Sequence, residues 1–92
     1  MMRMSAAETL GLRALAWVVA DGEALSRFFH VSGLEIADLR AKAGEPELLA
    51  AVLDFVLADD RLVERFCAAE NLDAQQLHQA RCALPGGTWQ EG

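Results

Sequence analysis

The chain has 92 residues, a formal net charge of -6 at pH 7, 53% hydrophobic residues and 24% charged residues. We expect residues 1–92 to form a single domain, because two domains of half this length would each bury too little surface to be stable. Ala and Leu together make up a third of the chain, whereas Val, Ile and Thr are scarce and Tyr is absent. This composition favours helices over strands and predicts an all-α fold.

The distribution of charge argues against nucleic acid as a partner. Eight Lys and Arg residues stand against 14 Asp and Glu residues, so the basic surface that binds a phosphate backbone is missing. Residues 1–44 carry five basic and five acidic residues, whereas residues 45–92 carry three and nine. All of the net negative charge therefore belongs to the second half.

The N-terminal segment imitates a secretory signal only loosely. Arg3 precedes an apolar run over residues 14–20, but the run is short and Arg13 interrupts the approach to it. A membrane-spanning helix needs an apolar run of about 18 residues, which the sequence does not contain. Two cysteines in a domain with an adequate core are typical of free thiols in a reducing compartment, so we expect a cytoplasmic protein.

Capping residues divide the first half of the chain into three predicted helices. Ser5 and Glu8 have the spacing of a capping box, which predicts a helix from there to about residue 20. Asp21 then caps a second helix, which ends at Gly33 because glycine tolerates the left-handed conformation. A short third helix ends at Gly44.

Capping residues of the same kinds mark the helix ends in the second half of the chain. Pro46 suits the first turn of a fourth helix, Asp59 caps a fifth, and Asn71 ends that helix in the role that glycine has earlier. A sixth helix is predicted over residues 74–84. Residues 88–92 are expected to be a frayed tail, in which Trp89 either folds back onto the domain or stays exposed.

The chain also contains an internal repeat. Aligning the sequence with itself pairs residues 10–44 with residues 48–82 without a gap and with nine identities. The identical pairs are Leu10 and Leu48, Leu15 and Leu53, Val18 and Val56, Ala20 and Ala58, Asp21 and Asp59, Arg27 and Arg65, Phe28 and Phe66, Leu34 and Leu72, and Leu39 and Leu77. We therefore predict a compact bundle of five to six short helices, built by duplication of a three-helix unit with pseudo-twofold symmetry.

The first helix of each predicted unit is apolar on nearly every side, over residues 14–19 and 49–57. Such helices must be buried at the centre of a bundle. We expect these two to pack together around the pseudo-twofold axis, near residues 14 and 15, with the other four helices covering them. Alternatively, their surplus apolar surface meets another subunit.

Arg13 and Asp54 are lone charges within these apolar helices, and the repeat aligns them with Ala51 and Ala16. If the two helices cross antiparallel, Arg13 faces Asp54, and we hypothesise an interhelical ion pair. Such a pair fixes the register of the helices more than it stabilises them, because desolvation offsets the Coulomb attraction. The alternative is that both side chains point to solvent.

Few residues suggest chemistry. His78 and Cys82 are four apart on one predicted helix and Cys67 lies on the preceding one, but a tetrahedral metal site requires a further ligand. A cysteine nucleophile with His78 as its base would also lack an orienting group and an oxyanion motif. We therefore predict no metal, no cofactor and no catalytic residues.

Several short motifs together resemble one known family. They are Leu12-Arg13-Ala14-Leu15-Ala16-Trp17, Ser32-Gly33-Leu34 with Asp38-Leu39-Arg40, Ala51-Val52-Leu53-Asp54-Phe55 followed by Ala58-Asp59, and the closing Ala83-Leu84-Pro85-Gly86-Gly87. In this combination the chain is similar to the bacterial domain of unknown function family 3572 over about residues 8–87. The resemblance implies a small helical cytoplasmic protein without an assigned activity, so no catalytic residue is carried over.

The surplus of apolar helix surface predicts an interaction module without catalysis. We expect it to bind another protein, or a second copy of itself, with Trp17 and Phe55 as candidate contact residues because they occupy equivalent repeat positions. The rival hypothesis is a ligand-binding or enzymatic pocket between the two halves that uses Cys67, Cys82 and His78. A DNA-binding helix-turn-helix would need a basic recognition helix, which the sequence lacks.

Overall fold

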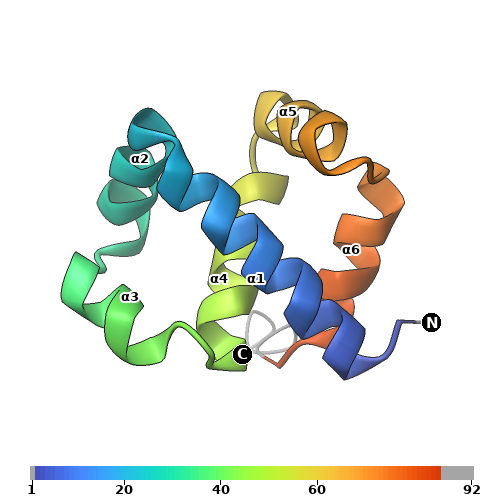
Figure 1. The fold of residues 1–92 in the computed structure, drawn as a ribbon, viewed down its shortest axis with the longest axis horizontal. Coiled ribbons are helices and arrows are strands. Elements are labelled where there is room, and N and C mark those ends of the chain that lie inside the picture. Colours follow the sequence, from blue (N-terminus) through green and yellow to red (C-terminus); the bar gives the residue numbers. More distant parts are fainter. Residues whose placement is uncertain (1, 86–92) are drawn as a thin grey trace.

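The computed structural model describes residues 2–85 and folds them into six helices without a strand in that range (Figure 1). The helices are α1 (Met4–Ala20), α2 (Gly22–Ser32), α3 (Ile36–Lys42), α4 (Pro46–Leu57), α5 (Asp60–Glu70) and α6 (Ala74–Ala83). The predicted all-α bundle is therefore confirmed. The predicted tail over residues 88–92, with Trp89, lies outside the described residues.

Most of the predicted helix ends are confirmed. The Asp21 carboxylate accepts hydrogen bonds from the Glu23 and Ala24 amides, and the Asp59 carboxylate accepts one from the Arg61 amide. At the other ends of these two helices, Gly33 has φ 75° and Asn71 has φ 57°, both in the left-handed region. Glycine and asparagine adopt this left-handed conformation at a helix C-terminus more readily than other residues.

The start of α1 differs from the prediction. The N-cap is Arg3, whose side chain makes no capping hydrogen bond, and the Ala7 amide donates to the Arg3 carbonyl at 2.9 Å. This bond starts the helical ladder upstream of Ser5, so Ser5 lies inside the helix. Its carbonyl accepts a hydrogen bond from the Thr9 hydroxyl at 3.0 Å. The predicted capping box of Ser5 and Glu8 is therefore wrong.

The centre of the molecule is the crossing of α1 and α4 (Figure 1), which pack more extensively on each other than any other two helices. Gly11 lies against Leu49 at this crossing, and a Cβ atom added to Gly11 would stand 2.8 Å from the Leu49 Cβ. The glycine is required because any side chain would prevent this approach. No described helix is both long and apolar enough to cross a membrane.

The remaining helices flank the central pair, with α2 and α3 on one side and α5 and α6 on the other (Figure 1). The second and third helices of the two halves begin at equivalent positions of the repeat: α2 at Gly22 and α5 at Asp60, α3 at Ile36 and α6 at Ala74. Gly11 and Leu49 are also equivalent in the repeat. Contact between two equivalent positions is expected where a pseudo-twofold axis passes between the two helices.

Two ion pairs link the halves reciprocally. Arg27 Nη2 of α2 lies 3.1 Å from Oδ2 of Asp59, which caps α5, and Arg65 Nη2 of α5 lies 2.8 Å from Oδ2 of Asp21, which caps α2. Each arginine therefore reaches the capping carboxylate of the other half. Exchange of the two halves converts one pair into the other.

The aromatic contacts follow the same exchange. Phe28 packs on Phe55 with ring centroids 5.4 Å apart at 68°, and Phe66 packs on Trp17 with centroids 5.4 Å apart at 61°. Both are edge-to-face contacts, the arrangement that the ring quadrupoles favour. The duplication of a three-helix unit stays a prediction, and these reciprocal contacts support it.

The two halves differ at their third helices. α6 packs against both α1 and α4 and buries Leu77, Ala80 and Arg81, whereas α3 has few contacts with any helix and buries only Leu39. Ile36, the first residue of α3, is 56% exposed. The correspondence between the halves is therefore incomplete, and the surface of α4 beside α3 is left partly uncovered.

Candidate functional site

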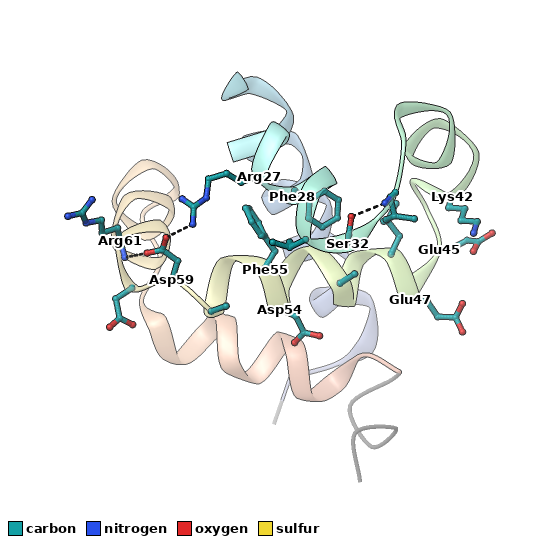
Figure 2. Close-up of a pocket in the computed structure, with 16 residues that line it drawn as sticks. Arg27, Phe28, Ser32, Lys42, Glu45, Glu47, Asp54, Phe55, Asp59 and Arg61 are labelled. Carbon is teal, nitrogen blue, oxygen red and sulfur yellow. Dashed lines mark hydrogen bonds and ion pairs between the residues drawn. The ribbon is translucent and has the colours of Figure 1, made fainter. Parts of the chain in front are cut away.

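A groove with a volume of about 1170 Å³ runs along α4 between α2 and the start of α5 (Figure 2). Its apolar lining comes mainly from α2 and α4, and includes Phe28, Val31, Leu48, Ala51, Phe55 and Ala58. The α4 residues among these recur every three to four positions, so they form one face of the helix. The groove is larger than the range of roughly 300–1,000 Å³ that is usual for small-molecule sites.

The apolar lining is anchored in the core. Phe28 is 1% exposed and Phe55 is 9% exposed, and their edge-to-face contact joins α2 to α4 at the groove. Val31, one turn further along α2, is 67% exposed and lies at the edge. The groove therefore has a rigid aromatic base and an accessible aliphatic edge.

At the equivalent place in the other half, an ion pair connects α1 to the end of α5. Arg13 Nε of α1 lies 2.9 Å from Oε1 of Glu70, and Arg13 Nη2 donates to the Glu70 carbonyl oxygen at 2.9 Å. In the repeat, Arg13 corresponds to Ala51 and Glu70 corresponds to Ser32. Neither of these short side chains can bridge α4 to α2, so the groove stays open.

A second substitution keeps α3 away from α4. Where α6 packs on α1, Ala80 and Ala7 are both 0% exposed. Lys42 corresponds to Ala80 in the repeat, and Glu45 corresponds to Ala7 if the same offset is continued just before the aligned ranges; both residues are exposed and line the groove. Small residues allow two helices to approach closely, whereas charged side chains keep their solvent and hold the helices apart.

Charged side chains surround the apolar lining. Asp59 and its partner Arg27 lie at the α5 end, and the Arg61 amide and then the Arg27 guanidinium lower the pKa of the Asp59 carboxyl below its ordinary value (Figure 2). Glu45 and Glu47 lie at the opposite end, beside the start of α4 (Figure 2). The rim is therefore mixed in sign and rich in carboxylates.

Asp54, in the middle of α4, also lines the groove and holds Arg81 of α6. Asp54 Oδ1 lies 2.6 Å from Arg81 Nε, and the Arg81 side chain is 10% exposed against 40% for Asp54. Arg81 Nη1 is buried without a hydrogen-bond partner in the described residues. The Asp54 carboxylate is therefore the main compensation for a buried positive charge.

The expected ion pair between Arg13 and Asp54 does not form among the described residues. Arg13 pairs with Glu70 and Asp54 pairs with Arg81, so each charge has a partner from the second half of the chain. The central helices are in close contact at Gly11 and Leu49, one turn before residues 14 and 15. Arg13 then lies beside the end of α5 and reaches its carbonyl.

The structure separates the two aromatic residues predicted to contact a partner. Phe55 lines the groove, whereas Trp17 packs on Phe66 and lies under the Arg65 guanidinium, which is 5.7 Å from its ring centroid. The two positions thus share a reciprocal aromatic contact but differ in whether they border the groove. Only Phe55 lies at the candidate site.

The cysteines and His78 do not form one cluster. His78 and Cys82 line a second cavity of about 620 Å³ with Met2 and Met4, whereas Cys67 does not line it. Cys67 is half-buried on α5, where burial raises the pKa of its thiol. The described residues contain no group of three or more His, Cys, Asp and Glu side chains that could hold a metal ion.

Sequence reasoning missed the groove and the residues that shape it. The signal was present in the repeat alignment, which pairs Arg13 with Ala51 and Ser32 with Glu70. These differences point to a groove only once it is known that α6 packs on α1. The partners of Arg13 and Arg81 are also set by contacts between helices distant in sequence.

Comparison with known proteins gives one result. A family model described as "Protein of unknown function (DUF3572)" matches residues 4–87. No curated protein and no solved structure matches the chain. Because the match covers nearly the whole sequence and agrees with the resemblance seen in its motifs, the chain belongs to the DUF3572 family.

Proposed function

We propose that this protein is an interaction module that binds a helical segment of another protein in the groove between α2 and α4. The observation that carries the proposal is the groove itself, where Ala51 and Ser32 stand at the positions that correspond to the Arg13–Glu70 ion pair of the other half. Amphipathic helices bind such grooves through apolar residues at i, i+3 or i+4, and i+7.

The dimensions of the groove support a helical partner. The lining from α4 and its C-cap extends from Leu48 to Ala58, a rise of roughly 15 Å, which matches about three turns of a partner helix. The lining is helical on both sides, and the described residues offer no strand to which an extended peptide could be added. A helix therefore fits this surface better than a strand.

A partner of a different sequence fits better than a second copy. The described surface has one exposed apolar helical stripe with suitable spacing, Leu12, Ala16 and Val19 on α1. Insertion of this stripe into the groove of another copy would join two different surfaces. Such a contact closes into a dimer only if both copies insert their stripes at once; a one-way contact builds rings or open filaments.

The proposal includes a cytoplasmic location and no catalysis. Cys67 and Cys82 are free thiols, as is usual in a reducing compartment. The carboxylate-rich rim of the groove would repel a phosphate backbone, which supports a protein partner over a nucleic acid.

Photo-crosslinking tests the proposal with a matched control inside the same chain. Benzoylphenylalanine would replace Val31 at the groove edge, or Ala69, the exposed residue that corresponds to Val31 in the other half. We expect a covalent product with one second protein from the Val31 position only, mapped to a helical segment of that protein.

Two results would overturn the proposal. One is equal labelling from Val31 and Ala69, which would show that no protein binds preferentially in the groove. The other is a product with twice the mass of the chain, which would assign the surface to self-association.

A further inference from the structure

We propose that α3 is a lid: when a helix binds in the groove, α3 tilts toward it and covers it with Ile36. This inference rests on the proposed function, because it describes how the same groove retains its occupant. Its basis is the comparison of α3 with α6, the equivalent helix of the other half, which lies on the opposite side of the central pair (Figure 1).

An ion pair fastens α6 to the centre of the bundle, and α3 has no such pair. Arg81 Nε of α6 lies 2.6 Å from Asp54 Oδ1 of α4, and the Arg81 side chain is 10% exposed. In the repeat these two residues correspond to Ala43, at the end of α3, and Ala16 of α1. Two alanines cannot form an ion pair, so the charged contact that holds the third helix in one half has no counterpart in the other.

The apolar attachment of α3 is also weaker. Ala80 of α6 is 0% exposed, whereas its equivalent Lys42 is exposed and lines the groove. Leu39 is the one buried residue of α3, and Leu34 and Ala43 beside its ends are half-buried against the core. A short helix held mainly at one central residue can tilt while that residue stays buried.

The chain that leads into α3 is held less firmly than its equivalent. At the end of α5 the Leu72 amide donates to the Cys67 carbonyl oxygen at 2.9 Å, a backbone bond that fixes where the chain turns toward α6. The equivalent amide, that of Leu34, donates instead to the Ser32 hydroxyl at 3.2 Å. After α3 the chain passes through Gly44, where even an added Cβ would meet nothing within 4 Å. The links at both ends of α3 are therefore suited to act as hinges.

Two large apolar side chains are exposed beside the first of these links. Val31 is 67% exposed at the groove edge, and Ile36 at the start of α3 is 56% exposed. Their equivalents in the other half are the small residues Ala69 and Ala74. Leu34 lines the groove, so Ile36 follows the lining by two residues. A tilt of α3 toward the groove would remove Ile36 from water against the bound helix, which favours closure.

The empty groove does not draw α3 inward. Lys42, Glu45 and Glu47 lie at the α3 end of the groove (Figure 2), and these charged side chains keep their hydration only while α3 stands away from α4. A bound helix offers Ile36 an apolar surface beyond these charges. The lid therefore closes on an occupied groove, and its closure slows release of the occupant more than entry.

The freedom of α3 can be measured without a partner. Nitroxide labels at Ala37→Cys of α3 or at Gln75→Cys of α6, its equivalent, would each be paired with a label at Ala20→Cys, in a chain that carries Cys67→Ala and Cys82→Ser. We expect pulsed electron paramagnetic resonance to give a distance distribution roughly twice as wide for α3 as for α6. Equal widths would overturn the lid.

The second test uses a designed peptide that is just long enough to span the groove as a helix and is amphipathic, with Leu and Ala on its apolar face. Its binding should narrow the α3 distribution to the width found for α6. Ile36→Ser should weaken binding roughly fivefold or more, mainly through faster dissociation in surface plasmon resonance. Because Ile36 is exposed, the same change should leave the Tm of the free chain unaltered.

Leu12→Ser is the matched control for Ile36→Ser. Leu12 is an apolar side chain of similar exposure, 45%, but it lies on α1 and does not line the groove. Its replacement should leave peptide binding unchanged. Equal losses of affinity from the two variants would overturn the lid, because they would show a general effect of exposed apolar surface.

The outcomes separate the lid from the function on which it rests. If the peptide binds but neither narrows the α3 distribution nor responds to Ile36→Ser, the lid is overturned and helix binding remains. If the peptide does not bind at millimolar concentration, helix binding in the groove is overturned, and closure over a helix is overturned with it. The widths for α3 and α6 in the free chain then still decide whether α3 is hinged.

Discussion

Gly11 of α1 and Leu49 of α4 are in direct contact, at positions that the internal repeat aligns with each other. The contact depends on one of the two residues having no side chain. It sets how closely the central helices approach and therefore how the flanking helices are placed.

Gly11→Ala should destabilise the fold, although alanine is a better helix former than glycine. The gain in helix propensity of about 0.5–1 kcal/mol is smaller than the cost of forcing a methyl group against Leu49, about 1–3 kcal/mol. Gly22→Ala is the matched control, because a Cβ there meets nothing within 4 Å. Urea unfolding would contradict the prediction if Gly11→Ala were as stable as Gly22→Ala.

The buried end of the Arg81–Asp54 pair predicts an asymmetric response to mutation. Asp54→Asn leaves the guanidinium of Arg81, a residue that is 8% exposed, without its charge partner and should cost about 1–3 kcal/mol. Arg81→Met keeps the apolar stem and removes the charge, so it should cost less. In thermal unfolding the double variant should resemble Arg81→Met alone, and additive losses would refute the coupling.

The exposed pair of Arg13 and Glu70 should behave differently. Its side chains are 42% and 29% exposed, so Arg13→Met is expected to change the free energy of unfolding by no more than about 1 kcal/mol. The change should shrink further in high salt, because exposed charges are screened. A loss as large as that of Asp54→Asn would show that closure of this half depends on the pair.

The capping carboxylates make stability fall in acid. Hydrogen bonds from backbone amides, together with the arginine from the other half, lower the pKa of Asp21 and of Asp59 below the ordinary value of 3.8. A lowered folded-state pKa means that the stabilisation is fully present above pH 3.8 and is lost as the pH falls through the folded-state value.

Replacement of both carboxylates by Asn tests this dependence, because Asn still caps a helix but does not titrate. The variant should lose less stability than the natural chain between pH 5 and pH 2 in urea titrations. Asp60→Asn is the control, since Asp60 makes no ion pair in the described structure. An unchanged acid profile in the double variant would rule out these two groups as its cause.

The left-handed cap at Gly33 predicts a local penalty for a side chain. Gly33 has φ 75°, so Gly33→Ala should lower the free energy of unfolding by about 1–2 kcal/mol even though the space around it is open. Gly44→Ala meets nothing within 4 Å and has no positive φ, so it should be close to neutral. If Gly33→Ala and Gly44→Ala lowered the Tm equally, the assignment of Gly33 as a left-handed cap would be contradicted.

The helices were predictable because their ends are marked by local chemistry. Asp21, Asp59, Gly33 and Asn71 each act on amides or carbonyls within a few residues, so their effect can be read without the tertiary structure. The start of α1 was predicted wrongly, although it too was inferred from a local pattern. Ser5 and Glu8 have the right spacing, but the helix already begins at Met4.

The candidate site was not predictable in the same way. Whether Arg13 meets Asp54 or Glu70 depends on how α1 crosses α4 and where α5 ends, and neither is a local property of the sequence. The groove is harder still, because it arises from a difference between two similar halves. The roles of Ala51 and Ser32 can be recognised only by comparison with Arg13 and Glu70, which form an ion pair at the equivalent positions of the other half.

The weak anchoring of α3 makes stability uneven across the molecule. With Leu39 as its one buried side chain, α3 should open locally at a lower free energy than α6, and its amides should exchange hydrogen for deuterium faster. The chain at the ends of α3, Leu34 and Lys42, borders the groove. An occupant would therefore slow exchange in a segment that is weakly protected in the free protein.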